Sequence, residues 1–246
     1  MVREYTLERY ARQLPLIGID GQRKLLKSTA LVVGAGGLGS SVLPYLVAAG
    51  VGRILIVDKG YVDLPDLNRQ VLYSEDDLGK AKAIAAAERL RRLNSSISIV
   101  SYIMDVTDKH FEELVMSADV IVDCLDNWTA RFVLNELAVK HLKPLVHAGV
   151  QEFYGQATTV IPGQTPCLKC IVPKASDRGE PIPIIGFTPA VLGSIEASEV
   201  IKILLGEKPA LAGILLVVDL KNVEFSKIRI VKKSDCPVCG AYTSAS

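Results

Sequence analysis

The 246-residue sequence has little net charge, no long apolar run and few cysteines. Its formal charge is +1 at pH 7, which gives no indication of a general nucleic-acid-binding or membrane-binding surface. The longest apolar runs, such as residues 213–218, are far shorter than the roughly 20 residues of a membrane-spanning helix. No apolar N-terminal segment resembles a signal peptide. We therefore expect a cytoplasmic protein that binds neither membranes nor nucleic acids.

The sequence also lacks internal repeats, low-complexity tracts and any linker long enough to separate domains. Its apolar residues amount to 49% and its charged residues to 22%, as in ordinary globular proteins. The chain is long enough to bury a substantial core. We therefore predict a single domain over residues 1–246, with N-terminal helices in 1–28, a nucleotide-binding half in 29–150 and a specialised C-terminal half in 151–246.

Residues 29–58 have the pattern of a mononucleotide-binding strand–turn–helix–strand unit. An apolar run is followed by a G-x-G-x-x-G sequence, a helix-compatible segment and a second apolar run that ends in Asp58. Gly34 would permit the tight turn, Gly36 would let phosphate approach the backbone, and Gly39 would let helix and strand pack closely. Phosphates would bind at the helix N-terminus, and Asp58 would accept a hydrogen bond from a ribose hydroxyl. The alternative is a tight turn without a ligand.

Predicted helices and strands alternate through the rest of the first 150 residues. The expected helices are two short ones within residues 5–26, then 40–49, 79–93, 109–116 and 128–141, and the expected strands are 30–33, 53–58, 97–102, 118–123 and 145–147. Such alternation predicts a Rossmann-like α/β fold, with a mostly parallel sheet, right-handed crossovers and flanking helices.

The C-terminal part has a different pattern. We expect a strand at 156–161, a proline-rich loop at 163–189, an amphipathic helix at 191–205 and a strand pair at 214–219 and 223–231. This pattern predicts a C-terminal antiparallel extension of the sheet.

Four of the five cysteines form two C-x-x-C pairs, Cys167 with Cys170 and Cys236 with Cys239. Two such pairs can place four thiolates tetrahedrally around zinc. About 65 residues separate the pairs, so the metal would tie the C-terminal tail to the loop after the 156–161 strand. Without a further ligand nearby, the site would be closed and structural. Two redox dithiols or four unrelated core cysteines are the alternatives.

The fifth cysteine, Cys124, stands alone between two aspartates at a strand end. A buried cysteine in a strand is usually a small apolar residue. A nucleophilic role for Cys124 is the alternative.

Six motifs occur along the chain in a fixed order. They are Arg9-Tyr-Ala-Arg12-Gln13, Gly34-Ala-Gly36-Gly37-Leu-Gly39, Asp66-Leu-Asn68-Arg69-Gln70, Gly79-Lys-Ala-Lys82, Asp123-Cys-Leu-Asp126-Asn127 and the paired C-x-x-C sequences. This order resembles that of the ThiF/MoeB/HesA proteins, the bacterial and archaeal relatives of ubiquitin-activating enzymes. The resemblance extends from about residue 5 to residue 240.

The resemblance implies an adenylyltransferase that uses ATP and magnesium. Its substrate would be the C-terminal glycine of a small ubiquitin-like sulfur-carrier protein ending in Gly-Gly, bound by the C-terminal half, for molybdopterin, thiamine or thiolated-tRNA synthesis. The attacking carboxylate is ionised at neutral pH and needs no general base. The site must therefore hold it in line with the α-phosphate and neutralise the charge on the phosphoryl oxygens.

The resemblance also implies roles for particular residues. Arg69 and Lys82, together with Asn68, match phosphate contacts, and Asp126 matches the carboxylate associated with magnesium. Arg12 matches an arginine that reaches ATP from a neighbouring subunit, which requires a homodimer. The implied catalytic residues are Arg12, Arg69, Lys82 and Asp126, and the implied ATP contacts are Gly34, Gly36, Gly37, Gly39, Asp58, Asn68, Arg69, Lys82 and Asp126. The alternatives are ordinary surface cations and, for Asp126, a helix N-cap.

The chain departs from several family members in one respect. Residues 174–191, the crossover segment before the last long helix, contain no cysteine, and the position that matches the family's cysteine falls near Gly179. We therefore expect no thioester or persulfide on this segment and a separate sulfur donor. The sequence ends at Ser246, so we expect no rhodanese-like extension.

Three other functions are compatible with parts of the pattern. The glycine motif alone would suggest an NAD-dependent oxidoreductase, although the cations and Asp126 have no role in hydride transfer. The missing crossover cysteine is compatible with a non-catalytic ATP-binding scaffold. A dehydratase of a modified tRNA base is a further variant, disfavoured by the paired cysteines and the near-neutral charge.

Overall fold

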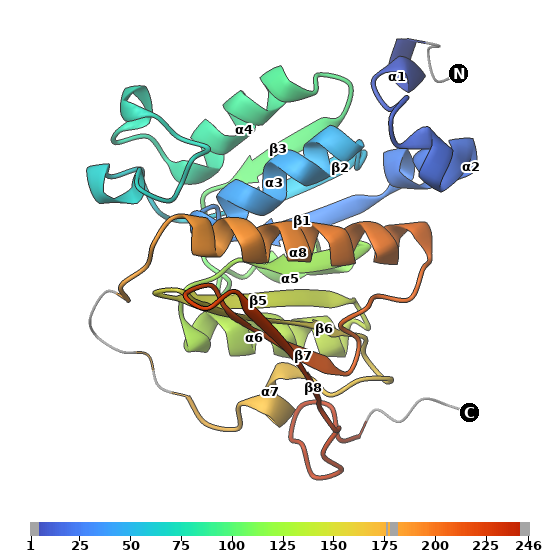
Figure 1. Ribbon diagram of the computed structural model, residues 1–246, viewed down its shortest axis with the longest axis vertical. Helices are drawn as coiled ribbons and strands as arrows, with labels where there is room; N and C mark the ends of the chain where they lie inside the picture. Colours follow the sequence, from blue (N-terminus) through green and yellow to red (C-terminus); the bar gives the residue numbers. More distant parts are fainter. Residues whose placement is uncertain (1–4, 176, 178–181, 242–246) are drawn as a thin grey trace.

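A computed structural model describes residues 5–175, 177 and 182–241 (Figure 1). Within these residues, strands form one sheet in the order β3-β2-β1-β4-β5-β6-β7-β8. The strands are β1 (Thr29–Val33), β2 (Arg53–Val57), β3 (Ser98–Tyr102), β4 (Val120–Asp123), β5 (Leu145–Gln151), β6 (Tyr154–Val160), β7 (Ile214–Asp219) and β8 (Glu224–Arg229).

The helices cover both faces of this sheet. The α-helices are α1 (Tyr5–Glu8), α2 (Leu14–Lys27), α3 (Gly37–Ala49), α4 (Lys82–Leu93), α5 (Phe111–Ser117), α6 (Trp128–Lys140), α7 (Leu168–Ile171) and α8 (Phe187–Leu205). Two 3₁₀ turns, η1 (Leu64–Asp66) and η2 (Glu75–Asp77), lie between β2 and α4. No described helix is long and apolar enough to span a membrane.

Strands β3, β2, β1, β4 and β5 are parallel, whereas β6, β7 and β8 continue the sheet antiparallel. The predicted Rossmann-like sheet with an antiparallel extension is therefore confirmed. The sequence order of the strands reverses between β1 and β4, and ligands bind in open α/β sheets at such a point, at the carboxyl ends of the strands.

Alternate residues of each parallel strand point to opposite faces, and each face has its own core. On β1, Ala30 and Val32 pack with α3, α4 and α8, whereas Leu31 and Val33 pack with α5 and α6. The first group of helices lies on one side of the sheet in Figure 1. Both faces of β1 are thus buried, which explains its continuous apolar sequence.

The N-terminal segment forms two helices as expected, and α2 is kinked at Gly18, where φ is 67°. Tyr10 is buried, and its hydroxyl accepts a hydrogen bond from the Asn94 side chain at 3.1 Å. The motif around Tyr10 is therefore partly a core element.

The structure differs from the sequence prediction mainly after β5. Helix α8 begins at Phe187 instead of residue 191, because Pro189 occupies its first turn, where a missing N–H costs no helical hydrogen bond. Short helix α7 lies inside the predicted loop. The amphipathic pattern expected for α8 is wrong, because Glu196 and Glu199 are both buried.

Candidate nucleotide-binding cleft and cysteine cluster

A cleft of about 850 Å³ opens at the carboxyl ends of β1, β2 and β4. Seven of the nine predicted ATP contacts line it, namely Gly34, Gly36, Gly37, Asp58, Arg69, Lys82 and Asp126. The cleft therefore brings together residues that the sequence places up to about 90 positions apart.

The glycine turn forms one wall of the cleft. Gly34 has φ of 99°, and a Cβ atom there would lie 2.4 Å from the Cys124 carbonyl oxygen. A Cβ atom at Gly39 would lie 2.2 Å from the Gly34 carbonyl oxygen. Both positions require glycine, so the predicted tight turn and close helix packing are confirmed.

Gly36 is different, because nothing in the described chain crowds it. The nearest atom to a Cβ there would be the Gln70 Nε2 at 3.8 Å. Gly36 is the N-cap of α3 and provides no side-chain hydrogen bond to the helix. Unpaired N–H groups at a helix N-terminus attract anions, so this end of α3 fits a phosphate.

Asp58 fixes the glycine turn to the end of β2. Its carboxylate accepts hydrogen bonds from the backbone N–H groups of Ala35 at 2.7 Å and Gly60 at 2.6 Å. Each carboxylate oxygen has a second acceptor position, so a ribose contact remains compatible with this geometry. That contact stays a prediction.

The two predicted phosphate-binding cations meet at Asp66. Its carboxylate lies 2.9 Å from the Lys82 Nζ and 3.3 Å from an Arg69 nitrogen. Arg69 also donates to the Asn68 side chain at 2.9 Å. Asn68 is exposed and does not line the cleft, so its predicted phosphate contact has less support than those of the two cations.

Asp126 projects at the mouth of the cleft as an exposed side chain. Asn127, not Asp126, caps α6, because the Asn127 side chain accepts a hydrogen bond from the Ala130 N–H at 2.8 Å. The Asn127 amide also donates to Asp126 at 3.1 Å. The N-cap alternative for Asp126 is therefore wrong, and this exposed residue lines the cleft.

Buried charged groups hold the turn that carries Asp126. Asp123 accepts a hydrogen bond from the Leu125 N–H at 3.1 Å, and Arg131 donates to the Leu125 carbonyl at 2.5 Å. His147 contacts Asp123 at 2.7 Å, and burial lowers the pKa of His147, so the imidazole is neutral near pH 7. Both peptide groups of Leu125 are thus fixed.

Two further buried groups lie close to this turn. Burial raises the pKa of the Cys124 thiol well above its ordinary value, which is opposite to the shift of a reactive cysteine. Burial, followed by the charge of Asp123, likewise raises the pKa of Glu196. Within the described chain, both Glu196 carboxyl oxygens lack a hydrogen-bond partner.

Asp177 from the crossover segment contacts the N-terminus of α6. Its carboxylate accepts hydrogen bonds from the Trp128 N–H at 2.5 Å and from the Thr129 hydroxyl at 2.5 Å. These hydrogen bonds lower the pKa of Asp177. Asp177 therefore lies at one side of the cleft, which it lines. The position near Gly179 discussed above lies outside the described residues.

Arg12 lies between α1 and α2, is exposed, and is not among the residues that line the cleft. In Figure 1, α1 and α2 lie beyond the amino end of β1, away from the glycine turn that precedes α3. Arg12 does not line the cleft of its own chain, so its predicted role would require a second subunit.

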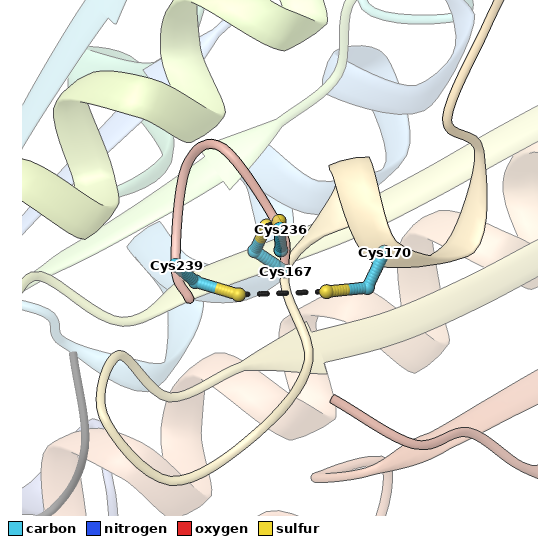
Figure 2. A group of neighbouring side chains, drawn as sticks. All are labelled: Cys167, Cys170, Cys236 and Cys239. Carbon is cyan, nitrogen blue, oxygen red and sulfur yellow. Dashed lines mark hydrogen bonds between the residues drawn. The ribbon is translucent and has the colours of Figure 1, made fainter. Parts of the chain in front are cut away.

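The four paired cysteines converge between α7 and the C-terminal loop (Figure 2). Their sulfur atoms all lie within 4.8 Å of one another, and all four residues are buried. Cys167 and Cys236 are 3.7 Å apart, and Cys170 and Cys239 are 3.4 Å apart. Four unrelated core cysteines are therefore excluded by the geometry.

This donor set fits zinc. Four sulfur ligands at about 2.3 Å from zinc would lie about 3.8 Å from one another, close to the two separations given above. Burial tends to raise the pKa of Cys236, but hydrogen bonds from the backbone of Cys239 and Val238 lower it to about 7. Burial raises the pKa of Cys239. A metal ion would favour the thiolate form of all four. The cluster could therefore hold zinc.

The sequence prediction missed three residues of the cleft. Asp66 stands in a motif already singled out, three residues before Arg69, a spacing that allows an ion pair. Arg131 carries no local signal, because its partners come from the turn after β4 and from β5. Asp177 is also without a local signal, since it lies 48 positions from the helix it contacts.

Comparisons with known proteins agree with this arrangement. A family model described as the ThiF family matches residues 10–238. The chain is 40% identical to the sulfur carrier protein adenylyltransferase of Thermus thermophilus, over 95% of this chain and 91% of that protein. It is 39% identical to the SAMP-activating enzyme E1 of Haloferax volcanii, over 95% of this chain and 89% of that protein.

Among solved structures, the chain is similar to Escherichia coli MccB bound to MccA-N7isoASN. The TM-score is 0.86 at 24% identity, over 96% of this chain and 75% of that one. At this identity the likeness shows the shared fold.

Proposed function

Because this chain belongs to the ThiF family, we propose that it is a cytoplasmic adenylyltransferase acting on a small ubiquitin-like sulfur-carrier protein. The carrier's C-terminal Gly-Gly carboxylate would attack the α-phosphate of ATP, forming an acyl-adenylate and releasing pyrophosphate. The observation that carries this proposal is the cleft itself, in which the glycine turn, two cations and Asp126 face one another.

The chemistry needs positioning and charge neutralisation more than acid–base catalysis. A carboxylate is already ionised near pH 7, and the leaving pyrophosphate is stabilised by cations and N–H donors. The N-terminus of α3 would bind phosphate oxygens, while Arg69 and Lys82 would neutralise the transferred charge. Asp58 would bind the ribose.

Asp126 would hold a magnesium ion, which would neutralise phosphate charge in the bound nucleotide. The exposed carboxylate has an oxygen of the type that this ion prefers, and Asn127 restrains it from one side. Hydrogen bonds fix both peptide groups of Leu125, the residue before Asp126. They would therefore keep Asp126 at the cleft mouth in the absence of the ion.

The proposal includes a homodimer in which Arg12 of one subunit reaches the cleft of the other. Its support is that Arg12 is exposed and lies outside the cleft of its own chain. Exposed apolar side chains on the adjacent helix α2, Leu16 at 86% and Ile19 at 49%, provide apolar area for a subunit contact.

We further propose that the four cysteines bind a structural zinc ion, and that residues 151–246 bind the carrier within a single domain. Sulfur would come from a separate donor protein. The choice between molybdopterin, thiamine and tRNA-thiolation pathways depends on which carrier the chain activates.

Pyrophosphate exchange tests the proposal. Exchange of labelled pyrophosphate into ATP should require magnesium and a carrier ending in Gly-Gly. Lys82→Ala should lower the exchange rate about a hundredfold or more. Lys80→Ala is the matched control, because Lys80 pairs with Asp77 outside the cleft, and it should retain the rate within about twofold.

Two results would count against the proposal. One is the absence of exchange with every Gly-Gly carrier from the same cell. The other is tight binding of NADH in place of ATP, which would favour an oxidoreductase. Binding of ATP without exchange in the presence of a carrier would indicate a non-catalytic scaffold.

A further inference from the structure

We propose that Asp66 is a positioning residue that holds Arg69 and Lys82 in a phosphate-binding arrangement before ATP enters. This inference rests on the proposed function, because it needs these two cations to bind phosphate. Its starting observation is that both cations contact one carboxylate, at 3.3 Å and 2.9 Å.

Asp66 is itself held by groups that are not cations. It is the last residue of η1 and accepts a hydrogen bond from the Asp63 N–H, at the N-cap of that turn, at 3.1 Å. The Gln70 side chain donates to it at 2.7 Å. The side chain is only 13% exposed. The carboxylate therefore has a fixed place, and the cations are restrained by it rather than the reverse.

The Lys82 ammonium keeps donors available for a ligand. An ammonium has three N–H donors, and Asp66 is its one ion-pair partner among the described residues. Lys82 begins α4, whereas Asp66 ends η1, so the contact joins two separate elements across the cleft wall. Without this contact, a long flexible side chain would have to be ordered by the incoming phosphate.

Arg69 is restrained in the same way. One nitrogen faces Asp66, and another donates to the Pro65 carbonyl at 2.8 Å. The two cations and one carboxylate leave a net charge of +1 beside the glycine turn. Asp66 therefore weakens the attraction of the two cations for a polyphosphate. It also lowers the entropic cost of ordering the Arg69 and Lys82 side chains when the ligand binds.

The chain contains a close counterpart of this arrangement outside the cleft. Asp77 ends η2, accepts a hydrogen bond from the Ser74 N–H at 3.0 Å, and pairs with Lys80 and Arg89 at 3.1 Å and 3.0 Å. Its side chain is 11% exposed, close to the value for Asp66. Of the two acids, only Asp66 lines the large cleft.

The counterpart provides a matched control. Asp66→Asn and Asp77→Asn each remove one buried carboxylate charge and two ion pairs from a 3₁₀ turn. The dissociation constants of ATP, inorganic pyrophosphate and adenosine are measured by calorimetry for the full-length wild-type protein and both variants. Thermal unfolding of each variant reports its folding separately.

Asp66→Asn should weaken ATP and pyrophosphate binding about tenfold, because two long side chains must then be ordered by the ligand. Adenosine, which carries no phosphate, should bind within twofold of the wild type. Asp77→Asn should leave all three constants within twofold, even if it lowers the melting temperature as much as Asp66→Asn does. Unchanged or tighter ATP binding by Asp66→Asn would overturn the inference, as would an equal loss of ATP affinity in Asp77→Asn.

A double variant separates this inference from the function on which it rests. Lys82→Ala with Arg69→Ala should abolish most ATP affinity, and adding Asp66→Asn to that pair should cause no further loss beyond twofold. If the pair binds ATP as the wild type does, the proposed function is wrong. If the pair loses affinity but Asp66→Asn alone does not, only the role of Asp66 is wrong.

Discussion

The cleft takes its residues from turns at the ends of neighbouring strands, whereas the cysteine cluster joins two segments about 65 residues apart. The cleft is open, and its charged groups retain unused donors and acceptors. The cluster is closed, with all four thiols buried and turned toward one another (Figure 2). This difference separates a site suited to exchanging ligands from one suited to keeping a single ion.

The two sites also differ in what their residues do for the fold. Strands β1, β2 and β4 pair along their whole length without help from the cleft side chains. Over residues 230–241 the loop after β8 pairs with no strand of its own, and the cysteines connect it to α7. Loss of the cleft residues should therefore affect ligands, whereas loss of the cysteines should affect stability.

Zinc removal is expected to have the largest effect. Cys236→Ala should lower the free energy of unfolding by at least about 3 kcal/mol, or the melting temperature by about 10 °C, because three thiols would remain without a complete ligand set. Elemental analysis should find about one zinc per chain in the wild type. Calorimetry at low temperature should show ATP affinity within twofold of the wild type.

Cys124→Ala is the control, since it removes a buried thiol outside the cluster. Its cost should be about 1 kcal/mol. A wild-type protein that contains no zinc and unfolds at the same temperature with and without a chelator would contradict the structural role.

A pair of glycine variants should separate folding from binding within the cleft. Gly39→Ala should destabilise the protein by about 2 kcal/mol, because its Cβ would lie 2.2 Å from the Gly34 carbonyl oxygen. Gly36→Ala should change stability by less than about 1 kcal/mol, since its φ is −78° and its nearest contact would be 3.8 Å away.

For ATP affinity, the variant with the smaller effect on stability, Gly36→Ala, should have the larger effect. Gly36→Ala should weaken ATP binding about tenfold or more, because a methyl group would separate phosphate from the α3 N–H groups. Urea unfolding and ATP titration of both variants give the comparison. Equal ATP affinity of Gly36→Ala and wild type would show that the turn does not approach phosphate.

Much of the cleft could be predicted from sequence because its signals are local. The glycine turn, Asp58 and the order of alternating elements each lie within a short stretch, and backbone sterics alone require glycine at Gly34. The convergence of the four cysteines was also predictable, since their spacing and chemistry indicate one site.

The unpredicted features depend on contacts between distant segments. Capping by Asn127 instead of Asp126 is decided by a one-residue difference in where α6 begins. The pairing of Lys82 with Asp66 depends on how the loop after β2 folds back on α4. Burial of Glu199 is possible because Thr159 and the Leu211 N–H donate to it, each at 2.8 Å. A periodic pattern in the local sequence cannot predict such partners.

Substitution of Glu196 should have the smallest effect on stability, and this effect should depend most on pH. Its pKa is raised above the ordinary value of 4.5, so above that pH the unfolded chain releases a proton that the folded chain keeps. Stability therefore falls as pH rises above 4.5. Glu196→Gln should remove this loss, raising the melting temperature by a few degrees at pH 8 and leaving it unchanged near pH 4.

Glu199→Gln is the matched control, because the Glu199 carboxylate accepts hydrogen bonds from Leu211 and Thr159. Both of these donors contact one carboxylate oxygen, and the other oxygen accepts from the Ala210 N–H and pairs with Lys202. The Gln amide nitrogen can replace neither oxygen, so this variant should be less stable at both pH values. A destabilising effect of Glu196→Gln at pH 8 would indicate that the Glu196 carboxylate is ionised and paired.

The most direct test of the account is the intact mass of carrier proteins incubated with this chain, magnesium and ATP. Proteins ending in Gly-Gly should gain one AMP group on the C-terminal carboxylate, and Lys82→Ala should prevent the gain. Cys236→Ala, assayed below its melting temperature, should still produce it. A wild-type protein that binds ATP and a carrier yet never transfers AMP would contradict the proposed activity.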